Sequence, residues 1–447
     1  MRRTSQVKTN RAGIFLPALA LLISVSTFFS TLVQGIQTQQ PSPRQDSAKK
    51  PKPLPAKLTS HVVLVLISGL RSDYLIDPDK NGLTIPTLGA LRDQGARAQG
   101  IESVYPSLGY PALATMVTGM LPVDHGIMAD SPFDEQSGQQ KEKQHPSPSE
   151  IRTEMIWDAA QRAGLSTAAV GFPLAAGTAI TFNQPEADDD NDRAGSAASI
   201  LEKHHPNLLL VCFRSFNDAQ IRYGPFSKEA AAALTHTDGL LKRIVDAAER
   251  AGIANEITFL IASDHGCAKI EREFKPNVVL AKKGLLTKDA QGKPQSWRAI
   301  AQPLGGAAAI LTRDPNDEKT AREAETAFRE IYEKPDSPIW RIISRRDASQ
   351  LGADARVAFY LDAAPLYVMS AGAGGDVKAK ATDRGATGYL PQRFEMRGAL
   401  IAAGRGIRAG AKVEYARLID IAPTIARLLG FEMKATRGRV ISEILSQ

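Results

Sequence analysis

An aspartate and a histidine stand next to each other at the end of a short, mostly apolar run of the chain. The run covers residues 256–263, and Asp264 and His265 follow it directly. A carboxylate and an imidazole are typical ligands of a divalent metal ion. Both residues also have structural uses, because an aspartate at a strand end often caps the next turn and a loop histidine often forms hydrogen bonds. The pair therefore indicates either a metal site or a polar turn.

Other polar side chains follow two further apolar runs. Ser68 comes after residues 61–67, and Asn217 and Asp218 come shortly after residues 207–213. A serine nucleophile needs a base or a metal ion to activate it, and the sequence places neither beside Ser68. We expect Asp218 to face the solvent, as a carboxylate on a strand-end loop usually does.

The apolar runs alternate with helical patterns. The runs are short and rich in aliphatic and β-branched residues, which is typical of buried parallel strands. Helical periodicity is clearest over residues 228–252, where a glycine ends the pattern. This alternation predicts an α/β fold with a doubly wound, mostly parallel sheet and helices on both faces. In such a sheet the functional side chains gather at the carboxyl ends of the strands, where Ser68 and Asp264 both fall.

Residues from about 268 to 380 are less regular and predict an inserted α+β cap. The segment contains short apolar runs, one highly charged helical pattern and a glycine-rich loop. After it, residues 398–404 predict a strand and residues 418–430 a helix, so the chain returns to the main fold.

The N-terminal region predicts export. Residues 12–35 carry no charge and follow four basic residues, which favour the cytoplasmic side of a membrane. The length of the segment fits a membrane anchor, and Gly35 also offers a poor cleavage site for a signal peptide. We therefore expect a protein that is anchored in the cytoplasmic membrane and faces the periplasm or exterior, or one that is secreted after cleavage. Residues 36–60 are rich in Pro and Lys and predict an extended linker.

The composition excludes some classes of function. The formal net charge is +7, but part of it lies around the apolar N-terminal segment, so we expect no nucleic-acid partner. Cys212 and Cys267 are the only cysteines and allow at most one disulfide, so the chain is not a disulfide scaffold.

The order of seven motifs resembles the type I phosphodiesterase/nucleotide pyrophosphatase family, a branch of the alkaline phosphatase superfamily. The resemblance covers residues 61–447 and implies a three-layer αβα core that hydrolyses phosphodiesters with two metal ions. The motifs are LISGLRSDYL (66–75), PTLGALRDQGARA (86–98), YPSLGYPALATMVTGMLPVDHGI (105–127), IWDAAQRAGLSTAAVGFP (156–173), RYGP (222–225), SDHG (263–266) and TGYLPQRFEMRGALIAAGRGI (387–407).

The resemblance also implies seven positions for metal ligands and nucleophile, and two of them keep the family residue. Asp264 and His265 match the family's Asp-His pair, whereas the position of the nucleophilic threonine holds Gly109. The other four ligand positions hold residues that bind metal weakly or not at all, namely Ser68, Asn217, Ile221 and Thr387. One metal position thus has no strong ligand, and the other keeps enough for zinc or another divalent cation at one weak site.

A neighbouring segment is expected to be structural. Residues 122–127 resemble the family's His-Gly-Ile turn, and we expect neither His125 nor the nearby Asp130 to be catalytic.

Three functions remain open on this basis. The first is a catalytically impaired member (pseudoenzyme) of the cell envelope, and the second is an active hydrolase with one metal or a rearranged site. The third is an envelope binding module. A phosphorylated small molecule or an envelope ligand would be the partner, with membrane contact through the N-terminal segment.

Overall fold

The structure is a computed structural model, and it describes residues 55–141, 144–184 and 189–446. The predicted anchor or signal segment and most of the linker lie outside these residues. Among the described helices, none has the length and apolarity needed to span a membrane.

The central sheet has eight strands in the order β21-β2-β20-β9-β1-β8-β6-β7. β1 (His61–Ile67) lies between β8 (Leu208–Phe213) and β9 (Ile257–Ala262) and is parallel to both. These three strands are the apolar runs of the sequence, and their residues are buried because both faces of the sheet are covered. The other strands are β2 (Ala96–Ala98), β6 (Thr167–Val170), β7 (Phe182–Gln184), β20 (Leu400–Gly404) and β21 (Lys412–Val413). β20 is antiparallel to both of its neighbours, β2 and β9. The other neighbouring strands are parallel to each other, so the sheet is mostly parallel, as predicted.

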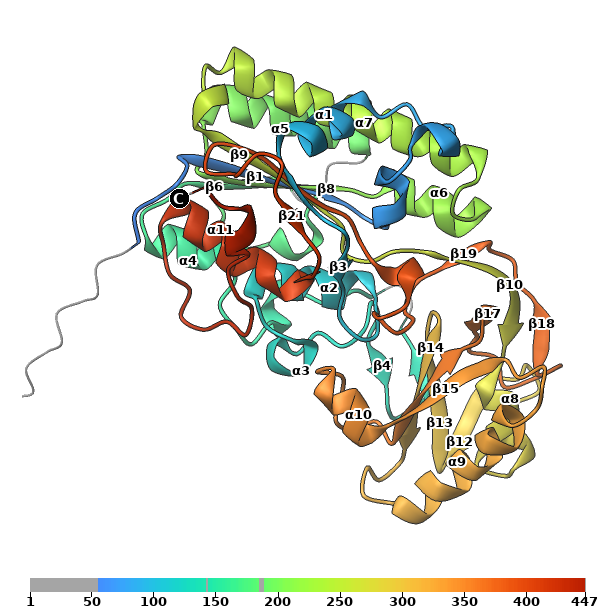
Figure 1. Cartoon of the computed structure of the whole chain (residues 1–447). Helices are drawn as coiled ribbons and strands as arrows, with labels where there is room; N and C mark the ends of the chain where they lie inside the picture. Colours follow the sequence, from blue (N-terminus) through green and yellow to red (C-terminus); the bar gives the residue numbers. More distant parts are fainter. Residues whose placement is uncertain (1–54, 142–143, 185–188, 447) are drawn as a thin grey trace, which may run out of the picture. The chain divides into compact units, whose positions relative to one another are not determined.

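Helices cover both faces of this sheet (Figure 1). Alternate side chains of β1 point to opposite faces, so Val63 and Val65 pack against one helical layer and Val62 and Leu64 against the other. The first layer contains α1 (Pro86–Gln94), α5 (Asp190–His204) and α7 (Lys228–Arg250). The second contains α2 (Gly109–Thr118), α4 (Ile156–Arg162) and α11 (Ile421–Leu429). The predicted three-layer αβα architecture is confirmed.

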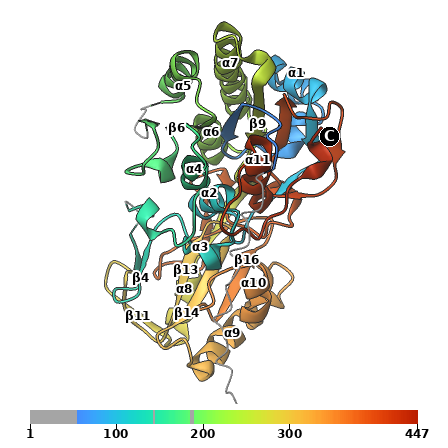
Figure 2. The same cartoon turned by 90° about the vertical axis from the view of Figure 1, so that its left-hand side faces the viewer.

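A second sheet is antiparallel, in the order β13-β14-β16-β15. Figure 2 shows α8, α9 and α10 beside its strands. Its hydrophobic cluster is distinct from the two clusters of the central sheet, but it takes in Tyr105 and Tyr389 from segments that border that sheet. The elements are β13 (Ala299–Leu304), β14 (Ala307–Thr312), β15 (Ile339–Ser344), β16 (Phe359–Ala363), α8 (Pro276–Lys282), α9 (Glu318–Tyr332) and α10 (Arg345–Gln350).

Smaller elements join the two sheets. β10 (Ala268–Phe274) leaves the end of the central sheet and pairs with β17 (Leu366–Met369), β18 (Lys378–Lys380) and β19 (Gly385–Ala386). β11 (Leu286–Lys288) and β12 (Pro294–Trp297) form a hairpin. The remaining short elements include α3 (Pro122–His125), α6 (Ser215–Tyr223), β3 (Ile101–Glu102), β4 (Phe133–Asp134), β5 (Gln139–Gln140) and β22 (Ala416–Arg417).

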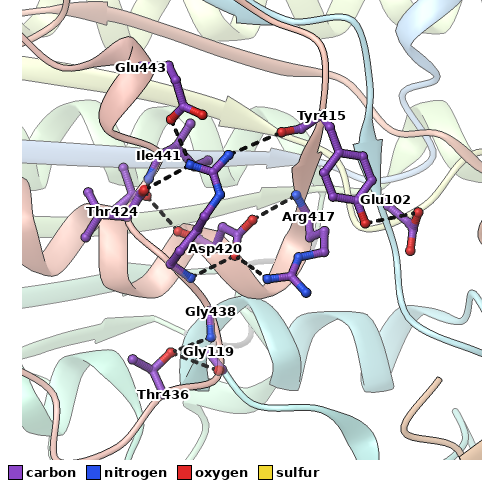
Figure 3. A network of polar contacts seen from close by, with 12 residues as sticks. Glu102, Gly119, Tyr415, Arg417, Asp420, Thr424, Thr436, Gly438, Ile441 and Glu443 are labelled. Carbon is purple, nitrogen blue, oxygen red and sulfur yellow. Dashed lines mark hydrogen bonds and ion pairs between the residues drawn. The ribbon is translucent and has the colours of Figure 1, made fainter. Parts of the chain in front are cut away.

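A buried carboxylate holds the C-terminal segment (Figure 3). Asp420 is fully buried, and its carboxylate accepts hydrogen bonds from the backbone N–H groups of Arg417 and Arg439. Its carbonyl accepts the Thr424 hydroxyl, whose oxygen accepts the N–H of Ile441 at 2.9 Å. The two side chains therefore fix the last part of the chain to the start of α11.

Candidate functional site

All seven positions implied by the resemblance line one cavity of about 270 Å³. The cavity lies at the carboxyl ends of β1, β8 and β9, which is where the sequence places functional residues of a parallel sheet. Ser68 follows β1, and the pair Asp264 and His265 follows β9. The others come from α6 (Asn217 and Ile221), the first residue of α2 (Gly109) and the loop after β19 (Thr387).

Asp264 is buried and its carboxylate is satisfied by the protein itself. Oδ2 accepts the Ser68 hydroxyl at 2.8 Å. Oδ1 accepts the backbone N–H groups of Gly69 at 3.0 Å and of His265 at 2.9 Å. Hydrogen bonds to the charged form stabilise a carboxylate without a cation. The serine at position 68 therefore supplies a proton donor where the resemblance implies a second carboxylate.

The tautomer of His265 follows from its hydrogen bond. Its Nδ1 lies 2.8 Å from the carbonyl oxygen of Gly266, which can only accept, so Nδ1 carries the proton. Nε2 then faces Oδ2 of Asp264 at 3.4 Å. The surviving pair thus offers one imidazole nitrogen and one carboxylate oxygen to a cation.

Asp130 also lines the cavity, which sequence reasoning missed. Its Oδ1 accepts the N–H of Tyr110 at 2.7 Å, in the first turn of α2. A Cβ atom placed on Gly109 would lie 3.5 Å from this oxygen, so the carboxylate borders the space of the missing nucleophile. Burial raises the pKa of Asp130, and nearby Asp264 raises it further, whereas the helix N–H groups and His265 lower it. Asp130 follows the turn that we expected to be structural, and nothing in its local sequence indicates the cavity.

His125, from the same segment, is buried and does not line the cavity. Nδ1 accepts the N–H of Ile127 at 3.1 Å, so Nε2 carries the proton and lies 2.9 Å from the Thr115 hydroxyl. Burial lowers the pKa of His125 to about 3, so the ring is neutral at physiological pH.

The other half of the cavity, at Asn217, Ile221 and Thr387, holds no strong metal ligand. The Asn217 side-chain oxygen is buried and has no hydrogen-bond partner among the described residues. Ile221 has an apolar side chain that cannot bind metal, and its carbonyl accepts the N–H of Arg384 at 2.9 Å. Together with the Thr387 hydroxyl, this half therefore provides no carboxylate and no imidazole.

Sequence reasoning also missed three residues of the cavity wall, namely Tyr110, His145 and Arg214. The rings of Tyr110 and His145 stack with centroids 4.9 Å apart, and His145 Nδ1 lies 3.0 Å from the Asp130 carbonyl oxygen. Arg214 directly follows β8, so the rule that placed Ser68 and Asp264 at strand ends could have indicated it as well. Burial raises the pKa of the Tyr110 hydroxyl, and Arg214 opposes this effect.

Two further sequence candidates contribute little chemistry. Cys212 lines the cavity, but burial raises the pKa of its thiol to about 12, which disfavours the reactive thiolate. Cys212 and Cys267 are both buried and are not joined to each other. Asp218 is exposed and does not line the cavity.

Comparison with known proteins decides the family. The model of type I phosphodiesterase / nucleotide pyrophosphatase matches residues 62–385. The chain belongs to this family. An uncharacterised pyrophosphatase/phosphodiesterase of Schizosaccharomyces pombe is 25% identical over 223 residues, which cover 47% of this chain and 45% of the relative. Human ectonucleotide pyrophosphatase/phosphodiesterase family member 1 is 24% identical over 46% of this chain and 24% of its own length. These matches span about half or less of the curated relatives.

A solved structure extends the likeness in fold. Human ectonucleotide pyrophosphatase/phosphodiesterase 5 superposes with a TM-score of 0.69 at 21% identity, covering 87% of this chain and 100% of that one. At this identity the likeness shows the fold alone, and it confirms the alkaline-phosphatase-like architecture.

The cavity does not fit the metal content typical of the family, which is zinc-dependent. In the part of the chain that the structure describes, no group of three or more His, Cys, Asp or Glu side chains is arranged to hold a metal ion. Zinc sites usually take three or four protein ligands, whereas Asp264 and His265 provide two. The oxygens of Asp264 are moreover already hydrogen-bonded, so a two-zinc centre does not fit these residues.

Replacement of Asp264 by alanine is expected to destabilise the fold by about 2–4 kcal/mol, because it leaves buried donors without acceptors. Chemical denaturation of the full chain measures this change. The exposed Glu333, replaced by alanine, is the matched control and should change stability by less than about 0.5 kcal/mol. An Asp264→Ala variant as stable as the control would show that the hydrogen-bond network contributes nothing.

Proposed function

We propose that this protein is a non-catalytic member of its family that uses the cavity for binding. The observation that carries the proposal lies at the start of α2. Gly109 offers no nucleophile there, and the Asp130 carboxylate accepts the N–H of Tyr110 beside it. A helix N-terminus is a ready site for a phosphate group, and here an internal carboxylate takes that place.

The charge at this position also opposes a phosphodiester. Like charges a few ångströms apart repel strongly in a partly buried site, and the described cavity holds two carboxyl side chains, Asp130 and Asp264, against one guanidinium group, that of Arg214. The floor of the cavity therefore favours a neutral or cationic group. Among the two partner classes considered, this supports an envelope ligand over a phosphorylated small molecule.

The remaining features of the proposal come from the sequence. We infer export, with residues 1–35 as anchor or signal peptide and residues 36–60 as linker. The family domain would begin at residue 61, and the inserted cap would extend from the start of β10 to the end of β18, residues 268–380. The supporting observation for the cap is its separate hydrophobic cluster.

The full chain is expected to contain less than one zinc ion per molecule and to show no turnover of bis(p-nitrophenyl) phosphate above the buffer rate, with or without added zinc or manganese. Elemental analysis and absorbance of the nitrophenolate measure these two quantities. Turnover that Asp264→Ala abolishes, in a preparation that circular dichroism shows to be folded, would overturn the proposal.

A hydrolase with a single metal ion is the second candidate. The observation in its favour is that Nε2 of His265 and Oδ2 of Asp264 lie 3.4 Å apart and face each other. This candidate requires turnover that depends on added metal and on both side chains, so His265→Gln should abolish the activity as Asp264→Ala does.

A further inference from the structure

A second hollow, unrelated to the cavity above, has a volume of about 480 Å³ and shares no lining residue with it. We call it the arginine groove. Its apolar wall contains Leu75, Ile76 and Phe394, and its polar wall contains Arg92, Arg97 and Arg397. Three guanidinium groups thus border one apolar surface.

Two side chains of the apolar wall are largely exposed. Ile76 is 71% exposed and Phe394 is 51% exposed, and both are large hydrophobic side chains. Scattered apolar residues on a surface need no explanation, but two of them in one hollow beside cations indicate a binding surface.

Local structure directs the arginines into the groove. Ala96 and Ala98 of β2 are buried, so the alternation of a strand turns Arg97 away from that core. Arg397 follows the short 3₁₀ turn Phe394–Met396. Phe394 and Arg397 both line the groove, so a ring and a cation border it together.

Two of these arginines differ from the third in how their side chains are held, although the charge of Asp93 also acts on Arg97. Arg92 is held by Asp93 at 2.7 Å and by the Leu75 carbonyl at 2.7 Å. The side chains of Arg97 and Arg397, in contrast, have no hydrogen bond or ion pair with any residue that the structure describes. Two guanidinium groups are therefore available to an anion.

An acidic side chain that interacts with Arg397 is Glu102, and it is engaged elsewhere. Burial raises the pKa of Glu102, and Arg417 and then Arg397 oppose this effect. Figure 3 shows the Glu102 carboxylate directed to the Tyr415 hydroxyl, at 3.5 Å. Glu102 does not line the groove, so it leaves the positive charge of the groove open to an anion.

We propose that the arginine groove binds a small anionic amphiphile, with its acidic headgroup on Arg97 and Arg397 and its apolar part on Ile76 and Phe394. The volume lies within the range of small-molecule sites, and the mixture of an apolar wall with a few placed charges is typical of them. A planar guanidinium pairs well with both carboxylate and phosphate, so either headgroup satisfies the chemistry.

Titration of the full chain, in nanodiscs of neutral phosphatidylcholine, with octanoate, octyl phosphate and octyltrimethylammonium tests the proposal by calorimetry. Binding of one or both anionic probes and at least tenfold weaker binding of the cationic probe are expected. The tighter of the two anions identifies the headgroup as carboxylate or phosphate. Equal binding of the cationic probe, or no binding of either anion, would overturn the proposal.

Variants locate the site. Arg97→Gln with Arg397→Gln is expected to weaken the anionic probe at least tenfold, and Ile76→Glu should do the same at an exposed position where folding is not at risk. The control is Arg322→Gln with Arg329→Gln on α9, where both arginines are exposed and paired with glutamates. Loss of binding in the control, or unchanged binding in Ile76→Glu, would place the anion elsewhere.

Discussion

A variant with six substitutions in the cavity is expected to hydrolyse bis(p-nitrophenyl) phosphate with added zinc much faster than the variant with the first five of them. The five restore the family residues at the degenerate positions, namely Ser68→Asp, Gly109→Thr, Asn217→Asp, Ile221→His and Thr387→His. The sixth is Asp130→Asn. All six residues line the same cavity, so the changes act at one site.

The sixth substitution matters because of the charge beside the nucleophile. Asp130 Oδ1 would lie 3.5 Å from the Cβ of a threonine at position 109. A carboxylate there repels the phosphodiester and hydrogen-bonds the N–H of Tyr110. Asparagine has nearly the same shape and removes the charge, and relief of one such repulsion is worth about 100-fold in rate. Initial rates and zinc content of the two variants measure the difference.

Two controls make this result interpretable. Asp130→Asn alone should remain inactive, since Gly109 still lacks a nucleophile. A variant that keeps Gly109 and carries the other five of the six substitutions should bind zinc and yet show no turnover. Equal rates for the variant with all six substitutions and the one that keeps Asp130 would show that Asp130 does not oppose the substrate.

The second large effect is a dependence of stability on pH that originates at Asp362 in β16. This side chain is fully buried, Oδ1 accepts the N–H of Leu390 at 2.8 Å, and Arg393 lies 3.5 Å from Oδ2. Burial raises the pKa of Asp362 to about 7, and Glu395 adds to this, whereas Arg393, the Leu390 N–H and Arg341 oppose it. Oδ2 has no hydrogen-bond donor among the described residues, which agrees with a carboxyl that is readily protonated.

The sign follows from the two pKa values. In the unfolded chain an aspartate titrates near pH 4, so between about pH 4 and pH 7 the folded state binds the proton more tightly. The contribution of Asp362 to the free energy of unfolding is therefore complete below about pH 4 and falls as the pH rises to about 7. The slope approaches about 1.4 kcal/mol per pH unit in that window.

Urea denaturation of the wild type and of Asp362→Asn at several pH values between about 5 and 7.5 isolates this group. The free energy of unfolding of the variant minus that of the wild type should rise with pH, because only the wild type must bury a charge. The exposed Asp336→Asn should give a difference that does not change over the same range, since its Lys378 partner lowers the pKa of Asp336. A flat difference for Asp362→Asn would show that Asp362 is already ionised in the folded state at the lowest pH of the series.

The sequence alone predicted the main strands of the central sheet and, through the resemblance, the residues at the family's ligand positions. Continuous apolar runs such as residues 61–67 and 257–262 have only one stable placement, as strands covered on both faces. The motif order placed Gly109 and Ile221 at positions of nucleophile and ligand, and a missing side chain or an apolar one is evident without coordinates. Strand ends then brought Ser68 and Asp264 to the same edge of the sheet.

Only the tertiary structure decided which side chains meet in the cavity. Asp130 is 21 residues from Gly109 in sequence, and the fold of the intervening turn brings its carboxylate to the start of α2. Ser68 and Asp264 are 196 residues apart, so their hydrogen bond and the charge balance that it provides depend on strand pairing. The arginine groove likewise combines residues from around positions 76, 97 and 397. Hydrophobic periodicity and sequence motifs describe contacts within one segment. Charged side chains from distant segments come together only when the chain folds.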